Sequence, residues 1–265
     1  MTGDLDSLAD FAGRLADAAR VETLPRWRDS GEARNKASEG RFDPVTEADV
    51  AAEHAMRALI ERDYPEHGIV GEETAARTSR GPWCWSLDPI DGTSAFICGI
   101  PTWVTLIGLL RDGEPVLGVI DVPRLGERYV GYGSRAILID AEGRHQLATS
   151  ACSSLADARL TATTPAMFKG ADQSAFKRVR ERVRIHRFGY DGYGYARLAA
   201  GSIDLVVESG LQPYDYNAVI PLVRAAGGVV GNWSGGSDMG SGQIVAAASQ
   251  PLFDEAVALL QNNAG

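Results

Sequence analysis

The sequence lacks the cysteine pattern of a zinc site or a disulfide framework. It contains three cysteines, an odd number, and none of them forms a CxxC pair. A reducing compartment is the simplest explanation of such a set. Long apolar runs are also missing, because no stretch approaches the ~18 uninterrupted apolar residues of a membrane helix. Residues 1–20 are amphipathic and acidic, unlike a signal peptide. We therefore expect a soluble, cytoplasmic protein.

Basic residues are in deficit as well. The 26 Lys and Arg residues face 35 Asp and Glu residues, which gives a net charge of −9. This negative net charge argues against a protein that generally binds nucleic acid or an anionic membrane, because both kinds of binding need clustered positive charge on the protein. An anionic substrate stays possible, since a bound divalent cation reverses the local field of an acidic site.

The composition is otherwise that of a globular protein. Apolar residues make up 45% of the 265 residues, and there is no low-complexity tract. Such a chain can bury a substantial core as one large domain or two moderate ones.

The first part of the chain predicts two helices packed on a largely antiparallel sheet. Apolar spacing indicates a helix over residues 4–23, and the glycine-punctuated polar stretch 28–43 is typical of a mobile loop suited to act as a lid. A second helix follows Thr46 as N-cap and ends near Pro65. Short strands come next, and Asp112–Gly113 predicts a hairpin turn between two of them.

A Ser- and Ala-rich stretch over residues 146–158 marks a change of pattern. After it, short strands alternate with helices over Gln173–Val183, over Tyr193–Ala200 and after Asp215, which is typical of an α/β arrangement. We therefore predict two halves, 1–148 with mainly antiparallel strands and 149–265 of α/β type. The fold class is mixed α+β and α/β.

Three acidic groups are candidates for chemistry: Glu72–Glu73, the pair Asp88 and Asp91, and Asp215. Each has a structural explanation when taken alone. Adjacent glutamates in a loop are usually solvated, Asp-Pro and Asp-Gly form turns, and an aspartate before a helix is often an N-cap.

The stretch "LDPIDGTS" nevertheless favours a metal site. Pro89 and the Asp91–Gly92 turn can hold the Asp88 and Asp91 carboxylates toward one point, together with backbone carbonyls. Mg²⁺ takes hard oxygen ligands of both kinds. If a helix opens at Thr93, its free N–H groups would lie beside the cations as a phosphate cradle. Such a combination describes metal-assisted phosphoryl chemistry.

Four motifs in the same order resemble those of the inositol monophosphatase superfamily of Mg²⁺-dependent, lithium-sensitive phosphatases. They are "DPVTEAD", "GEE", "DPIDGT" and the "YD" that precedes "AAGG", and they span residues ~43 to 230. The resemblance implies alternating α-β-α-β-α layers, a homodimer and two or three Mg²⁺ ions per site.

The resemblance also implies roles for individual residues. Metal ligands would be Glu72, Asp88, the Ile90 carbonyl, Asp91 and Asp215. Phosphate would meet the amides of Gly92 and Thr93. Asp49 would pair with Thr93 and, with Glu72, help to activate a water that attacks phosphorus. Three features depart from the family pattern. Tyr214 replaces the usual tryptophan before Asp215, the Arg224–Ala225 pair replaces the acidic residue often found before "AGG", and Pro221 predicts a kink in the following helix.

Longer strings, such as "DGYGYARLAAGSIDLVVESGLQPYDYNAVIP", look most like the histidinol-phosphate phosphatase branch. Asp191 and Glu208, with Asp91, would then bind substrate, because the leaving alcohol carries an amine and an imidazole. The structural alternatives are a turn residue for Asp191 and an exposed strand end for Glu208. Inositol phosphate is the alternative substrate.

Experiments can distinguish two rival functions from this hypothesis. "DPIDGT" superficially resembles the D-x-D-G-T motif of phosphatases that form an aspartyl phosphate, although its aspartates are three apart rather than two. A catalytically silent, metal-dependent binding protein is the second rival, but it predicts loss of a ligand residue, and every one is present.

Overall fold

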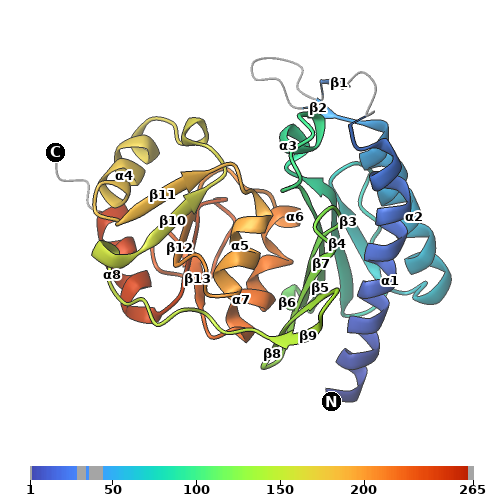
Figure 1. Cartoon of the computed structure of the whole chain (residues 1–265). Coiled ribbons are helices and arrows are strands. Elements are labelled where there is room, and N and C mark those ends of the chain that lie inside the picture. Colours follow the sequence, from blue (N-terminus) through green and yellow to red (C-terminus); the bar gives the residue numbers. More distant parts are fainter. Residues whose placement is uncertain (1, 29–33, 36–43, 262–265) are drawn as a thin grey trace.

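Helices and sheets alternate in layers through the molecule (Figure 1). The computed structural model describes residues 2–28, 34–35 and 44–261. One outer layer holds α1 (Thr2–Arg26) and α2 (Glu47–Asp63), and it covers the first sheet. The central layer holds α5 (Gly192–Ala199) and α7 (Val219–Ala225), between the two sheets, and α4 (Ala171–Arg180) and α8 (Gln250–Gln261) cover the second sheet. The α-β-α-β-α layering predicted from the sequence is confirmed.

The first sheet has seven strands in the order β3-β4-β5-β6-β7-β8-β9. Only the β3–β4 pair is parallel, and the other pairs are antiparallel as predicted. The expected hairpin turn joins β5 and β6, with positive φ at both Asp112 and Gly113. The strands are β3 (Gly68–Gly71), β4 (Trp83–Asp91), β5 (Val104–Arg111), β6 (Glu114–Val122), β7 (Glu127–Tyr132), β8 (Arg135–Asp140) and β9 (Gly143–Gln146).

The second sheet is mixed, in the order β11-β10-β12-β14-β13. Strands β11, β10 and β12 run parallel, whereas β14 is antiparallel to both of its neighbours. Its strands are β10 (Arg159–Ala162), β11 (Ile185–Phe188), β12 (Leu205–Glu208), β13 (Val229–Asn232) and β14 (Ile244–Ala247). One core joins both sheets through α5 and α7. The division at residue 148 stays a prediction.

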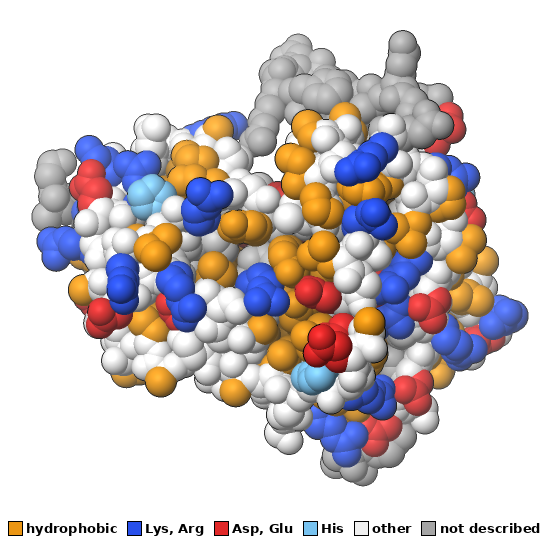
Figure 2. All heavy atoms as spheres, viewed as in Figure 1, with side chains coloured by type: hydrophobic (Ala, Val, Ile, Leu, Met, Phe, Trp, Pro, Cys, Tyr) orange, Lys and Arg blue, Asp and Glu red, His pale blue; other side chains and the backbone are white. Residues whose placement is uncertain are grey.

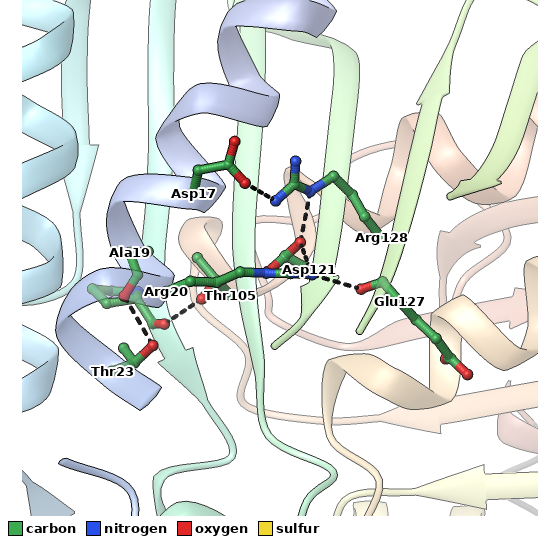
Figure 3. Close-up of polar contacts among 9 residues, drawn as sticks. Asp17, Ala19, Arg20, Thr23, Thr105, Asp121, Glu127 and Arg128 are labelled. Atoms are coloured by element: carbon green, nitrogen blue, oxygen red, sulfur yellow. Dashed lines mark hydrogen bonds and ion pairs between the residues drawn. The ribbon is translucent and has the colours of Figure 1, made fainter. Parts of the chain in front are cut away.

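A buried carboxylate fastens α1 to the first sheet (Figure 3). Asp121 on β6 is fully buried and accepts hydrogen bonds from Arg20 Nε at 2.6 Å and Arg128 Nε at 2.7 Å. Arg128 also donates to Asp17 on α1 at 2.6 Å. Because a buried charge is costly unless it is paired, these two guanidinium groups hold α1 against β6 and β7.

A row of glycines crosses the other face of the sheet. Gly108, Gly118 and Gly131 lie opposite one another on β5, β6 and β7. A Cβ atom built on Gly118 would overlap the carbonyl of Ala218, and one on Gly131 would overlap the backbone of Leu222. The missing side chains therefore let the start of α7 lie directly on the sheet.

The helix predicted after Asp215 is two helices, and the break between them lies just before Pro221, where a kink was predicted. Asp215 lies inside the short α6 (Pro213–Tyr216), and α7 starts anew at Val219. Pro221 is the third residue of α7. Its missing N–H causes no loss there, because first-turn N–H groups have no partner within a helix.

On the face shown in Figure 2, basic and acidic side chains are interspersed, and hydrophobic side chains gather mainly along the line between the two sheets. Among the described residues, none of the helices combines the length and the apolar character that crossing a bilayer requires. The loop predicted over residues 28–43 falls mostly outside the described residues. Within it the structure describes Arg28 and the pairing of β1 (Arg34–Asn35) with β2 (Pro44–Val45).

Candidate active site

A bulge near the end of β4 turns two aspartates to the same side of the sheet. Asp88 pairs with Leu106 and Asp91 with Val104, so Pro89 and Ile90 together oppose Thr105 alone. Residues three apart on a regular strand point to opposite faces, and the extra residue cancels this alternation. The Thr105 hydroxyl donates to the Pro89 carbonyl at 2.8 Å, which satisfies a buried group that the bulge removes from the ladder.

Carboxylates from both parts of the chain meet at this bulge. Oxygen atoms of Asp88, Asp91 and Asp215 all lie within 4.8 Å of one another. Burial is the main cause that raises the pKa of the Asp88 carboxyl, and the nearby Glu72, Asp91 and Asp215 add to it. Burial likewise raises the pKa of Asp91, with Asp191 and Asp215 as further causes, and brings that of Asp215 to about 7. The cluster predicted from three separate motifs therefore exists.

Glu72 reaches Asp88 from the loop after β3. Its backbone N–H donates to the Leu87 carbonyl of β4 at 3.2 Å, which ties the loop to the strand that carries Asp88. A hydrogen bond and charge repulsion between the two side chains contribute to the raised pKa of Asp88. Glu72 thus lies beside the acidic cluster.

Asp215 lies at the third position of α6, in a capping box. Its Oδ2 accepts the Gln212 N–H at 2.7 Å, and its own N–H donates to the Gln212 carbonyl at 3.0 Å. The position agrees only in part with the N-cap alternative, because Gln212 is the capping residue. The box orients the carboxylate while α6 lies next to β4 (Figure 1).

The segment after the bulge forms the short helix α3 (Thr93–Ile97). Gly92 precedes it with a φ of 84°, a conformation that favours glycine. The first intrahelical bond runs from Phe96 N–H to the Gly92 carbonyl, so the N–H groups of the first turn are left for another acceptor. This geometry suits the predicted contact of Gly92 and Thr93 with phosphate.

Two predicted contacts involve residues that have other partners here. The Thr93 hydroxyl donates to the Ile90 carbonyl at 3.0 Å, the predicted metal-binding oxygen. Asp49 is fully buried in the capping box of α2, where its Oδ2 accepts from the N–H and the hydroxyl of Thr46 at 2.8 and 2.6 Å. Thr46 is the N-cap as predicted. The pairing of Asp49 with Thr93 stays a prediction.

The second half contributes Asp191 immediately before α5. A Cβ atom built on Gly92 would lie 2.8 Å from Asp191 Oδ2, so this carboxylate sits against the proposed phosphate loop. The next residue, Gly192, donates its N–H to Asp91 Oδ2. Burial raises the pKa of Asp191 to about 6, and a hydrogen bond from Thr163 opposes this shift.

Glu208 at the end of β12 is buried rather than an exposed strand end. Its Oε1 accepts from the N–H and hydroxyl of Thr163 at 2.9 and 2.5 Å, and its Oε2 accepts from the Tyr195 hydroxyl at 2.9 Å. Burial raises its pKa to about 7, and these hydrogen bonds act against the increase. The carboxylate is therefore fixed in one orientation.

The donor set fits a divalent cation. Asp88, Asp91 and Asp215 offer hard carboxylate oxygens, which Mg²⁺ prefers, and they stand close enough for Asp91 and Asp215 to raise the pKa of Asp88. Cations relieve this repulsion. The first-turn amides of α3 add a place for an anion beside them. A layered α/β fold with such a cluster next to a helix start is an arrangement suited to metal-assisted phosphoryl chemistry.

Comparison with known proteins gives the family. The family model for the inositol monophosphatase family matches residues 4–264. The bifunctional phosphatase IMPL2, chloroplastic, of Arabidopsis thaliana is 40% identical over 242 residues, which cover 88% of this chain and 66% of that protein. The histidinol-phosphatase of Mycobacterium tuberculosis is 33% identical over 97% of this chain and 98% of its own length. A solved inositol monophosphatase from Zymomonas mobilis superposes with a TM-score of 0.84 at 36% identity, over 97% of this chain and 98% of that one.

The chain therefore belongs to the inositol monophosphatase family and is a phosphatase of that family. Members of this family depend on Mg²⁺ in general, with which the acidic cluster agrees.

Sequence reasoning missed several residues that hold the site. Thr105, Thr163 and Tyr195 act through hydrogen bonds to groups far away in the chain, and a single sequence carries no signal for such partners. Glu53 was detectable, because it is an acid one helical turn after Asp49 on a face that also carries the apolar Ala52 and Met56.

Proposed function

We propose that this phosphatase hydrolyses histidinol phosphate to histidinol and phosphate in a Mg²⁺-dependent reaction. The observation that carries the proposal is the Asp191 carboxylate, which lies against Gly92 at the proposed phosphate loop. A phosphomonoester held there would direct its alcohol toward this acid. The amine and the imidazole of histidinol can both carry positive charge, and charge-assisted hydrogen bonds to a carboxylate suit them better than a neutral polyol.

Asp191 and Glu208 divide the recognition of substrate in this proposal. Glu208 already accepts three hydrogen bonds from Thr163 and Tyr195, so it presents a fixed negative edge. Asp191 supplies the second charged contact. A cation bound next to these acids lowers their raised pKa values of about 6 and about 7 and so favours their charged forms.

The remaining roles follow the family assignment. Glu72, Asp88, Asp91, Asp215 and the Ile90 carbonyl would hold two or three Mg²⁺ ions, which supply a water of lowered pKa and neutralise charge on the phosphate oxygens. Gly92 and Thr93 would bind phosphate through their N–H groups. Asp49, paired with Thr93, and Glu72 would help to activate the attacking water. We further propose a homodimer in the cytoplasm, without nucleic acid or membrane partners, and two halves that join near residue 148.

The substrate is tested by comparing kcat/KM for histidinol phosphate, inositol 1-phosphate and a nucleotide bisphosphate in Mg²⁺. The proposal expects histidinol phosphate to be preferred, and Asp191→Asn to lower kcat/KM for it by about 10-fold or more, in keeping with loss of a charge-assisted hydrogen bond. The same substitution should leave inositol phosphate hydrolysis nearly unchanged. A preference for inositol phosphate, as the name of the Zymomonas mobilis relative suggests for that protein, would overturn the substrate assignment.

A further inference from the structure

Glu53 is a buried acid next to the site that the proposed reaction does not use. It lies on α2, one turn after Asp49, and its side chain is fully shielded from solvent. A carboxylate in this position is costly unless donors surround it. Its donors lead directly to the loop that carries Glu72.

The loop after β3 is wrapped around the Glu53 carboxylate. Oε2 accepts the backbone N–H of Glu73 at 2.8 Å, and Oε1 accepts the N–H and the hydroxyl of Thr74 at 3.2 and 2.5 Å. Glu72 is the residue immediately before these donors. Its own N–H is bonded to Leu87 on β4, so the Glu72 backbone is held from both sides.

Arg57 completes the clamp one turn further along α2. Its Nε donates to Glu53 Oε1 at 2.7 Å, and its Nη2 donates to the Thr74 carbonyl at 3.2 Å. The ion pair therefore satisfies both N–H and C=O groups of the loop, in place of a neighbouring strand. A charged partner makes each of these hydrogen bonds stronger and more directional than a neutral one would.

Gly71 shows that the fit is tight. A Cβ atom built on this residue would overlap the carboxylate carbon and both carboxylate oxygens of Glu53. Even alanine at position 71 would therefore push the carboxylate away from the loop. Gly71 and Glu53 form one unit, in which a missing side chain on the strand makes room for a buried charge on the helix.

We propose that Glu53 is a positioning residue that orients Glu72 for cation binding by fixing the backbone of residues 73 and 74. This inference rests on the proposed role of Glu72 as a metal ligand. Groups that orient metal ligands typically contribute 10- to 100-fold to metal affinity or activity. Glu53→Gln keeps the size of the side chain but turns an NH₂ group toward backbone N–H donors, which frees the loop.

The test measures binding of Mn²⁺ to the full chain, without substrate, from the electron paramagnetic resonance signal of the free ion. We expect the dissociation constant of the Glu53→Gln protein to rise by about 10- to 100-fold. Glu61→Gln on the same helix is the matched control, because that side chain is 54% exposed and contacts only Arg77 at 3.8 Å among its ion pairs in the described chain. It should bind Mn²⁺ as the unsubstituted protein does.

A double-mutant cycle keeps the test decisive if Glu53→Gln folds poorly. Gly71→Ala should weaken Mn²⁺ binding in the parent protein but have little further effect in a Glu53→Ala background, because both changes act through one carboxylate. Thr74→Ala removes a single donor and should give a smaller shift. A purely structural Glu53 would lower the melting temperature of the metal-free protein and leave the dissociation constant of the folded protein unchanged, which would overturn the inference. Failure of the parent protein to bind Mn²⁺ would instead overturn the proposed function.

Discussion

Gly192 donates its backbone N–H to the carboxylate of Asp91, and this bond joins the first sheet to the helix layer between the sheets at the centre of the site. Asp91 ends β4 of the first sheet, whereas Gly192 begins α5 in the layer between the sheets. A Cβ atom on Gly192 would also collide with Asp91. The proposed metal ligand is thus held in place by the same segment that presents Asp191 to substrate.

Asp91→Asn removes the negative charge of this side chain but keeps its shape and position. The amide can still accept the Gly192 N–H, but one negative charge of the cluster is lost. We expect kcat to fall by about 10³-fold, as for other losses of a preorganised electrostatic group. The metal-free protein should become more stable, because one source of like-charge repulsion disappears. Phosphate-release assays and thermal unfolding in a chelator measure the two effects. Asp254→Asn on the exposed face of α8 is the control, and an unchanged kcat for Asp91→Asn would refute the metal assignment.

The stability of the metal-free protein should fall as pH rises from about 4 to about 7. Asp191, Glu208 and Asp215 have raised pKa values of about 6, 7 and 7 in the folded chain, against ordinary values of 3.8, 4.5 and 3.8. In this window the folded chain binds more protons than the unfolded chain, so each increase in pH favours unfolding. The stabilisation from these three groups is complete below about pH 4 and lost above about pH 7.

Mg²⁺ should reverse this trend, because the cation binds the ionised carboxylates. Melting temperatures between pH 4 and pH 8, with chelator and with Mg²⁺, check both statements. Burial would raise the pKa of Asp204, but its hydrogen bonds to Arg159 and Ser150 lower it overall. Asp204 therefore titrates below pH 4 and does not affect stability in this window. If the melting temperature of the metal-free protein instead rises between pH 4 and pH 7, the acids of the site are not protonated in the folded chain, and the prediction is wrong.

Asp191→Gly should stabilise the protein while it harms the reaction. Asp191 has a φ of 47° and a ψ of −139°, a combination that is essentially reserved for glycine. Such strain costs of order 1–3 kcal/mol and persists at functional sites. After the extra flexibility of glycine in the unfolded chain is subtracted, we expect a gain of about 1 kcal/mol in the free energy of unfolding.

Denaturant unfolding of Asp191→Gly and Asp191→Asn separates strain from charge, because only the first variant relaxes the backbone. Asp112→Gly, at a hairpin turn with a φ of 52°, is a matched substitution remote from the acids. It should leave kcat/KM for histidinol phosphate unchanged, whereas both Asp191 variants lower it. Equal stability of the Gly and Asn variants at position 191 would argue against backbone strain.

Gly118→Ala should weaken both the fold and cation binding. The new methyl group would overlap the Ala218 carbonyl, and α7 would have to move away from the sheet. Overpacking of this kind typically costs about 1–3 kcal/mol. Because α6 precedes α7 directly, Asp215 should shift as well. The Mg²⁺ concentration needed for half-maximal activity should therefore increase. Gly81→Ala, where nothing lies within 4 Å of the added carbon, is the control. Unchanged stability of Gly118→Ala would show that the helix adapts without cost.

Local sequence patterns predicted the elements well and also singled out acidic candidates that lie together in the fold. Thr46 as N-cap, the Asp112–Gly113 turn and the alternation of strands and helices depend on neighbours in the chain, so a single sequence contains their signals. Asp88 and Asp91 were found for the same reason. Asp215 joined them only through the family resemblance, since nothing local shows that it meets β4.

The parts that could not be predicted depend on contacts between distant segments. The bulge at Pro89 requires the Thr105 hydroxyl of the next strand, and Glu208 is buried because Thr163 and Tyr195 supply its donors. The segment at Asn217 and Ala218, between α6 and α7, lies directly on Gly108 and Gly118. Apolar periodicity describes which face of an element is buried, but not which backbone it will touch.

The glycine row also links the acidic cluster to packing between distant segments. Asp88 and Asp91 belong to the first sheet, whereas Asp215 meets them from a segment that is followed directly by α7, which lies on Gly108, Gly118 and Gly131. An unfinished polypeptide therefore lacks the full set of acids. A cation at the proposed site would therefore stabilise the packing of α7 on the sheet as well as the first sheet itself.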